Sequence, residues 1–251
     1  MIGALIGAIA AAAQIGPGGG EGPTPTAPAI LGYNHGEVAD ASQVTTTING
    51  VNAGDLLLVF GAVYHYEGSP PGAVVVDTIL GDYSDSNTYT SRAGPVDATP
   101  PSTAGYLHLE AWTAVAQASG NVTFKLTGGR WMSIVALRIS PFHAAILDVS
   151  PATLDVYQGS GAELLIDLGT TTYSHCLVVG CYTWWDSSRM PTYSAEWPLI
   201  TGRNDGNNDY VQMVAVGKQV TAVGNWDPVI IADSVGSEYV GIGLVIRGKD
   251  V

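Results

Sequence analysis

The sequence predicts an all-β protein, built as two tandem antiparallel β-sandwiches behind a short apolar N-terminal segment. From Val44 onward, apolar runs alternate with clusters of Gly, Asn, Asp and Pro, which is the pattern of strands and turns. The 32 Gly and 14 Pro, together with abundant Val, Thr and Tyr, favour many short strands. The series of runs occurs twice along the 251 residues, a length that suits two domains.

The first element is an apolar segment, residues 2–15, with the sequence IGALIGAIAAAAQI. It lacks the basic residues of a secretory signal and is shorter than the roughly 20 residues of a spanning helix. A free tail, a buried docking peptide or symmetry-axis helix, and a membrane-inserting peptide all remain open. Docking is the favoured interpretation, because so apolar a tail would promote aggregation if it were exposed. The predicted anchoring side chains are Ile2, Leu5, Ile6, Ile9 and Ile15.

A linker rich in Gly, Pro and Thr follows at residues 16–29. Its glycines make the first half flexible, and its Pro-x-Pro spacing makes the second half extended. The expected organisation is 1–29 for the anchoring segment and linker, 30–141 for the first sandwich and 142–251 for the second.

Each copy is expected to hold seven strands. The first series is expected at 44–48, 55–64, 73–79, 87–92, 105–115, 121–127 and 131–139. The second is expected at 153–157, 162–168, 176–185, 197–202, 209–217, 228–232 and 239–247. Four local matches in the same order indicate a duplication: 58–64 with 177–183, 106–112 with 210–216, 120–121 with 224–225, and the strands ending at Arg138 and Arg247. Matched residues of the two copies are about 119 positions apart in the early strands and about 104 apart in the later ones. The first copy therefore contains about fifteen extra residues, which we expect within 65–86.

The residue pattern within the strands indicates how they are covered. In 106–114 polar and apolar residues alternate, which predicts one buried face and one solvated face. The runs 56–63 and 177–181 are apolar throughout, so they are expected to be central strands covered on both faces. Two packed sheets of this size suit an immunoglobulin-like or a jelly-roll sandwich, and both remain open.

Charge and cysteine content exclude some partners and roles. The net charge is −13, with nine Lys and Arg residues, none of them before Arg92. Such a surface repels phosphate backbones and anionic membranes, so neither nucleic acid nor a membrane is an expected partner. Cys176 and Cys181 lie five residues apart on one predicted strand, which directs them to opposite faces and prevents a disulfide between them.

Two motifs resemble structural proteins of tailed bacteriophages. Gly54-Asp55-Leu-Leu-Leu-Val, followed by Asp85-Ser86-Asn87-Thr88-Tyr89-Thr90, is similar to their "GDLLLV … DSxGNTYT" pattern, with Ser86 where a Gly is usual. The segment 109–123 resembles a strand pair of these proteins, and 196–200 resembles their "GW.LI" element, with Glu196 in place of Gly. The resemblance spans about 30–250. It implies a virion protein: a minor tail or tail-fibre component, or a capsid decoration protein.

Two acidic turns are candidates for calcium, and no other cofactor is expected. Asp205, Asn207 and Asp209 have the alternate spacing of calcium-loop ligands, but the final carboxylate of such a loop is missing. The competing interpretation is a hairpin turn whose Asn, Asp and Gly adopt left-handed conformations. Asp82, Asp85 and Asn87 form a similar turn in the first copy.

The sequence holds no motif for catalysis. The histidines at 35, 65, 108, 143 and 175 lack zinc-ligand spacing, so each is expected on the surface or at a strand end. Neither a nucleophile elbow, nor a phosphate loop, nor a dinucleotide fingerprint is present. A non-enzymatic protein is therefore predicted.

Aromatic residues near strand ends are candidates for contact with a glycan or a protein partner: Tyr64, Tyr66, Trp184, Trp185, Tyr193 and Trp197. The adjacent Trp184 and Trp185 must point to opposite faces, so one of them is expected outside the core. Packing in the core or against another protein is the favoured interpretation, and a sugar-stacking platform is the alternative.

The predicted function is a virion structural protein that docks through its N-terminus into a symmetric particle. Its expected partners are other virion proteins and further copies of itself. The first alternative is a receptor- or carbohydrate-binding module that recognises a host-surface glycan through loops near 65–86 and 184–209. The second is a secreted surface protein or an accessory domain of a hydrolase.

Overall fold

The computed structural model describes residues 25–39, 41–65, 73–79, 81–98, 105–185, 191–203, 211–232 and 237–249. Strands dominate these residues, and the one helical element among them is a short 3-10 turn, η1 (Tyr83–Asp85). The strands form four antiparallel sheets packed as sandwiches, so the predicted fold class is confirmed. The predicted anchoring residues, from Ile2 to Ile15, lie outside the described residues.

The first copy is a sandwich of one five-stranded and one three-stranded sheet. Its strands are β1 (Ala29–Val38), β2 (Gln43–Val51), β3 (Leu56–His65), β4 (Val74–Asp77), β5 (Thr90–Ala98), β6 (Tyr106–Val115), β7 (Gly120–Thr127) and β8 (Trp131–Ser140). The larger sheet has the order β1-β8-β3-β6-β5, and the smaller has the order β2-β7-β4.

The second copy repeats this arrangement strand for strand. Its strands are β9 (Ala152–Gln158), β10 (Glu163–Leu165), β11 (Cys176–Trp185), β12 (Thr192–Tyr193), β13 (Leu199–Arg203), β14 (Val211–Val220), β15 (Val229–Ile231) and β16 (Ser237–Arg247). The sheet orders are β13-β14-β11-β16-β9 and β10-β15-β12. Each strand of the first copy therefore has a counterpart in the second whose number is eight higher, and the sheet orders agree when the large sheet of the second copy is read from β9 to β13.

Strand order decides between the two sandwich types that the sequence left open. The first four strands of each copy alternate between the two sheets, and the last strand pairs between the first and the third. This wrapping is that of a jelly roll, in which consecutive strands cross from sheet to sheet. An immunoglobulin-like domain instead keeps its first two strands in one sheet.

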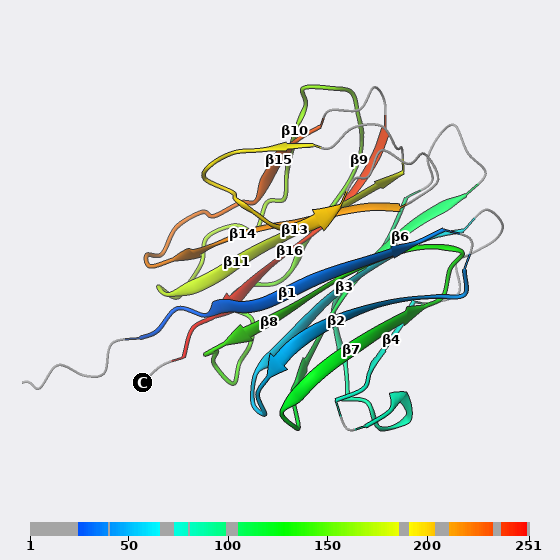
Figure 1. Cartoon of the computed structure of the whole chain (residues 1–251). Coiled ribbons are helices and arrows are strands. Elements are labelled where there is room, and N and C mark those ends of the chain that lie inside the picture. The colour runs from blue at the N-terminus through cyan, green and yellow to red at the C-terminus, as the bar shows by residue number, and fades with distance from the viewer. Residues whose placement is uncertain are drawn as a thin grey trace, which may run out of the picture.

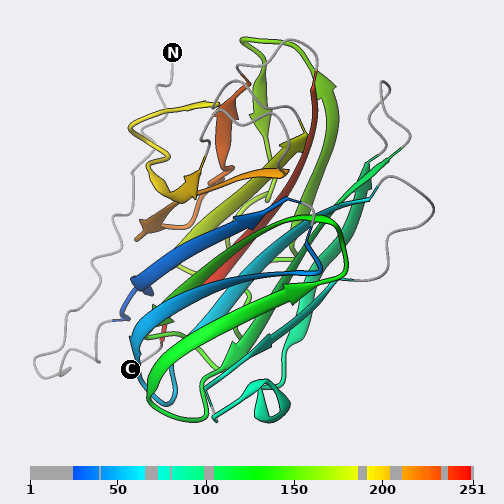
Figure 2. The same cartoon turned by 45° about the vertical axis from the view of Figure 1, so that its right-hand side comes forward.

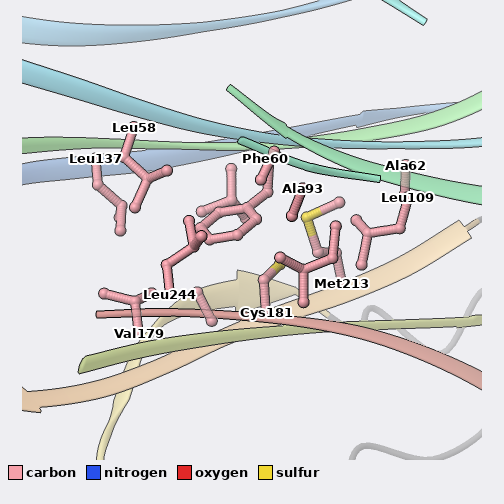
Figure 3. Packing of buried hydrophobic residues seen from close by; sticks show 14 of the residues in the cluster. Leu58, Phe60, Ala62, Ala93, Leu109, Leu137, Val179, Cys181, Met213 and Leu244 are labelled. Atoms are coloured by element: carbon pink, nitrogen blue, oxygen red, sulfur yellow. The ribbon is translucent and has the colours of Figure 1, made fainter. Parts of the chain in front are cut away.

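The two jelly rolls pack their five-stranded sheets face to face, giving a body of four layers (Figures 1 and 2). The space between these sheets holds a hydrophobic cluster to which both copies contribute, including Leu58, Phe60 and Leu109 from the first and Cys181 and Met213 from the second (Figure 3). We call it the shared core. Each copy also has its own core between its large and small sheets.

The shared core explains why the runs 56–63 and 177–181 are apolar throughout. One face of β3 or β11 meets the small sheet of its own copy, and the other meets the opposite copy. The predicted coverage on both faces is thus confirmed. Cys181 lies in the shared core and Cys176 in the second copy's own core, so the cysteines do point to opposite faces, and both are free.

The stacking of the two large sheets follows an approximate two-fold symmetry. β1 lies against β13 and β5 against β9, while β8 and β6 lie against β14 and β16. Because β13 is the counterpart of β5, and β9 of β1, each copy uses the same face in the same way. This is the isologous arrangement of a symmetric dimer, formed within one chain.

Each copy has a glycine at the equivalent position of its central strand, where the small sheet approaches the large one. A Cβ at Gly61 in β3 would lie 2.8 Å from Leu126 of β7 and 2.9 Å from Trp112. A Cβ at Gly180 in β11 would lie 2.5 Å from the ring of Pro228, just before β15. The matched glycines in 58–64 and 177–183 are therefore required by close packing.

Each expected strand overlaps a strand of the structure, and two further strands were not predicted. β1 was missed because its sequence, AILGYNHGEV, contains two Gly and an Asn, which are depleted in strands. β12 was missed because it is two residues long. The extra length of the first copy lies between β3 and β5, at residues 66–89, where the second copy has only residues 186–198 between β11 and β13.

Candidate functional site

Three of the six predicted contact aromatics belong to the core. Tyr64 and Trp184 are fully buried, and Trp197 is 3% exposed. Trp184 packs against Tyr239, with ring centroids 6.0 Å apart. Their use as a contact platform was therefore wrong: each faces inward from a strand or turn that the opposite sheet covers.

The other three predicted contact aromatics have different outcomes. Tyr193, at the edge of the small second sheet, is 42% exposed. Tyr66 and the side chain of Trp185 lie outside the described residues. The structure therefore does not assemble these six residues into a platform.

The Glu196-Trp197 element is held together by one lysine. The Nζ atom of Lys218 lies 4.3 Å from the centroid of the Trp197 ring and 2.7 Å from the Glu196 carboxylate. The same Nζ lies 4.6 Å from the centroid of the Trp226 ring. These contacts fix the entry to β13.

The first acidic turn is organised around a buried carboxylate. Asp77, at the end of β4, is fully buried and accepts hydrogen bonds from Asn87 Nδ2 at 2.8 Å, from Ile79 N at 3.0 Å and from the Tyr89 hydroxyl. Asn87 Oδ1 in turn accepts from Gln117 N at 3.1 Å. Burial and the Asp77 charge raise the pKa of Tyr89, so its hydroxyl stays protonated and donates.

This network corrects the expectation of a calcium turn at Asp82, Asp85 and Asn87. Asn87 is 4% exposed and uses its side chain within the network, while Asp82 caps η1 by accepting from Ser84 N at 2.7 Å. The SDSNTYT sequence thus anchors the β4–β5 connection to the sandwich.

The predicted metal ligands of the second copy, Asp205, Asn207 and Asp209, lie outside the described residues. In the part of the chain that the structure describes, no three His, Cys, Asp or Glu side chains gather closely enough to hold a metal ion.

His108 of β6 is buried, contrary to the expected surface position. It is 3% exposed, although the alternation in 106–114 predicted a solvated face. Its Nδ1 lies 2.7 Å from Asp97 Oδ1, and its Nε2 lies 3.6 Å from Glu110 Oε2. Burial alone would lower the pKa of His108, but the carboxylates of Glu110 and Asp97 outweigh it and raise the pKa. The cluster thus links a buried histidine of β6 to a half-exposed carboxylate of β5.

A second ionisable pair lies at the interface of the copies. Glu238 of β16 is 9% exposed and faces the first copy, since Val240 on the same face belongs to the shared core. Asp155 of the edge strand β9 pairs with Val240 and so lies on that face too. Burial and the neighbouring Asp155 carboxyl raise the pKa of Glu238 to about 7.

This pair makes stability depend on pH. The folded-state pKa of Glu238, about 7, exceeds the ordinary value of 4.5, so its contribution is complete below pH 4.5 and is lost as the pH rises through 7. Glu238→Gln is therefore expected to raise Tm at pH 8 by roughly 2–4 °C, the effect of about 1 kcal/mol in a protein of this size, and to give no gain at pH 4.

Thermal scans across this pH range check the expectation. Glu163→Gln, which changes an exposed carboxylate on β10, is the control and should leave the pH profile unchanged. An unaltered profile in Glu238→Gln would show that the carboxyl pair does not cause the pH dependence.

Both ends of the described chain lie at one end of the body, beside the start of the connection between the copies, which runs from β8 to β9. Thr26 N donates to Lys249 O at 3.2 Å, so the segment entering β1 runs beside the segment leaving β16. Gln219 Nε2, near the end of β14, donates to Pro28 O at 2.9 Å. Thr26 and Pro28 of the predicted linker are therefore held against the second copy. We call this region the terminal end (Figure 1).

A buried ion pair stabilises the terminal end. Arg138 Nε of β8 lies 2.5 Å from Asp55 Oδ2, and the same oxygen accepts from Asn52 N at 2.8 Å. Gly54 has a φ of +92°, which allows the tight turn from β2 into β3. The Gly-Asp of the GDLLLV motif thus serves this turn and its ion pair.

A groove of about 470 Å³ opens beside this turn. It is lined by Gly54, Ser140, Pro141, Phe142, His143, Ala144 and Lys249. Phe142 also packs against the shared core. The groove was not predicted, because its lining comes from three distant parts of the sequence and no local pattern marks it. It is the candidate functional site of the described residues.

Comparisons with protein-family models, curated proteins and solved structures give no match to this chain. Among the described residues, none forms a helix long and apolar enough to cross a membrane.

Proposed function

We propose that this protein is a non-enzymatic structural component of a bacteriophage particle, attached through its N-terminal segment and presenting its double jelly roll outward. The observation that carries the proposal is the terminal end. The hydrogen bond between Thr26 and Lys249 fixes the point at which the N-terminal sequence joins the body. A rigid block tethered at one end by a Gly/Pro linker and an apolar segment is suited to docking on a larger assembly.

The body itself supports a structural role. The shared core joins the two jelly rolls through their largest apolar faces, so that the chain presents one block rather than two hinged domains. The phage-like motifs at Asp55 and Asn87 hold turns and connections, as expected of a pattern that encodes a scaffold. Jelly rolls occur in viral capsid proteins as well as in lectins, so the fold alone does not choose between these.

The burial of Tyr64, Trp184 and Trp197 weighs against the glycan-binding alternative. A sugar-stacking platform needs aromatic faces open to solvent, and these three side chains face the interior. Assembly is therefore the function that the geometry favours.

Deletion of residues 2–15 tests the docking role. The shortened chain should fold normally and fail to enter particles when it competes with the full chain during phage growth. A matched control, deletion of 18–20 within the linker, should enter particles at the level of the full chain, because it removes only three glycines. Equal incorporation of the chain lacking 2–15 would refute attachment through the N-terminus.

A further inference from the structure

The groove at the terminal end has a partly apolar lining without a described occupant. Pro141, Phe142 and Ala144 supply its apolar wall, and Lys249 supplies a basic residue. Its volume of about 470 Å³ lies within the range of pockets that bind ligands or peptide side chains. The chain offers a matching segment close by.

That segment is residues 2–15, and its point of attachment lies beside the groove. Thr26 hydrogen-bonds to Lys249, which is itself part of the lining. The residues between 15 and 26 reach about 33–36 Å when fully extended. This length, with four glycines among residues 16–20, allows the apolar segment to turn back onto the groove.

Charge complementarity also favours binding of the N-terminal segment at the groove. Glu21 is the only Asp, Glu, Lys or Arg among residues 2–36. It precedes Thr26 by five residues, and Thr26 is hydrogen-bonded to Lys249, so about 17–18 Å of extended chain lets the Glu21 carboxylate reach the Lys249 side chain. An acidic group beside this lysine is favoured, because the chain has few basic residues and a net charge of −13.

Covalent connection through the linker favours binding of the chain's own segment over binding of the same segment from a neighbouring molecule. A short flexible linker gives an effective concentration in the millimolar range, well above that of a second copy in dilute solution. Covering the segment also removes an exposed apolar surface that would cause aggregation.

We infer that, in the free protein, the groove takes up apolar side chains from residues 2–15 of its own chain, with Glu21 close to Lys249. The segment is thereby stored until it docks on the particle; only this later step rests on the proposed function. The groove is thus an intramolecular docking site that holds the anchor before assembly.

Photo-crosslinking of the full chain tests the inference. A benzophenone amino acid is placed at Ala144, an exposed groove residue, and in a control protein at Tyr157, which is 54% exposed on β9. After illumination, mass spectrometry should find crosslinks from position 144 to residues 2–15 within monomers, at a yield independent of protein concentration. Position 157 should give none. A carbodiimide should also join Glu21 to Lys249, and Glu21→Gln should abolish that product.

The outcomes separate this inference from the proposed function. Crosslinks from position 144 to residues 2–15 found only in dimers would assign the groove to a second copy and overturn the inference. The absence of any crosslink to 2–15 would overturn it as well. Neither result bears on whether deletion of 2–15 prevents entry into particles, which is measured separately.

Discussion

Phe60→Ala is expected to lower the free energy of unfolding by about 3–5 kcal/mol, the usual cost of removing a large aromatic side chain from a core. Phe60 is fully buried between the two large sheets, where side chains of both copies surround it. Because this core is shared, both jelly rolls should lose stability together. In a protein of this size the change corresponds to a fall in Tm of roughly 6–20 °C.

Differential scanning calorimetry measures this effect. We expect one transition in the unmodified protein and one in Phe60→Ala, displaced to lower temperature. Leu31→Ala is the control, because Leu31 is 50% exposed on β1 and its truncation should change stability by less than about 0.5 kcal/mol. Two transitions, only one of them displaced by Phe60→Ala, would mean that the copies are independent domains.

Asp77→Ala is expected to destabilise the protein by about 3 kcal/mol, counting two hydrogen bonds to a charged acceptor at roughly 1.5 kcal/mol each. The variant leaves Asn87 Nδ2 and the Tyr89 hydroxyl without the carboxylate that they contact in the interior. The β4–β5 connection should then detach from the sandwich. Hydrogen exchange should increase first at residues 81–89.

Asp82→Ala is the matched control for this loop. Asp82 is exposed and caps η1 through Ser84, so its loss should destabilise the protein much less than the loss of Asp77. Chemical denaturation of both variants provides the comparison. Equal effects would show that the Asp77 network does not hold the connection in place.

The strands and the duplication could be predicted because each produces a local pattern of residues in the sequence. The apolar runs at 56–63 and 177–181 indicated central strands, and their matched glycines lie where each small sheet closes on β3 or β11. β1 escaped prediction because its strand conformation is imposed by pairing with β8, against the weak strand preference of its Gly and Asn residues.

The sites were less predictable because burial depends on contacts between distant segments. His108 sits in a polar-apolar alternation typical of a solvated face, yet it is buried beside Asp97 of the neighbouring strand. Trp184 stands near a strand end, and its exposure could not be inferred without knowing that Tyr239 and the small sheet cover it. The groove joins residues 54, 140–144 and 249, which nothing in the sequence links.

Mass spectrometry of gradient-purified particles tests the proposal that this chain is a structural component of a phage particle. We expect the chain, including residues 2–15, to co-sediment with the particles in a fixed ratio to their major protein. Recovery of the chain only in the fractions without particles would contradict it.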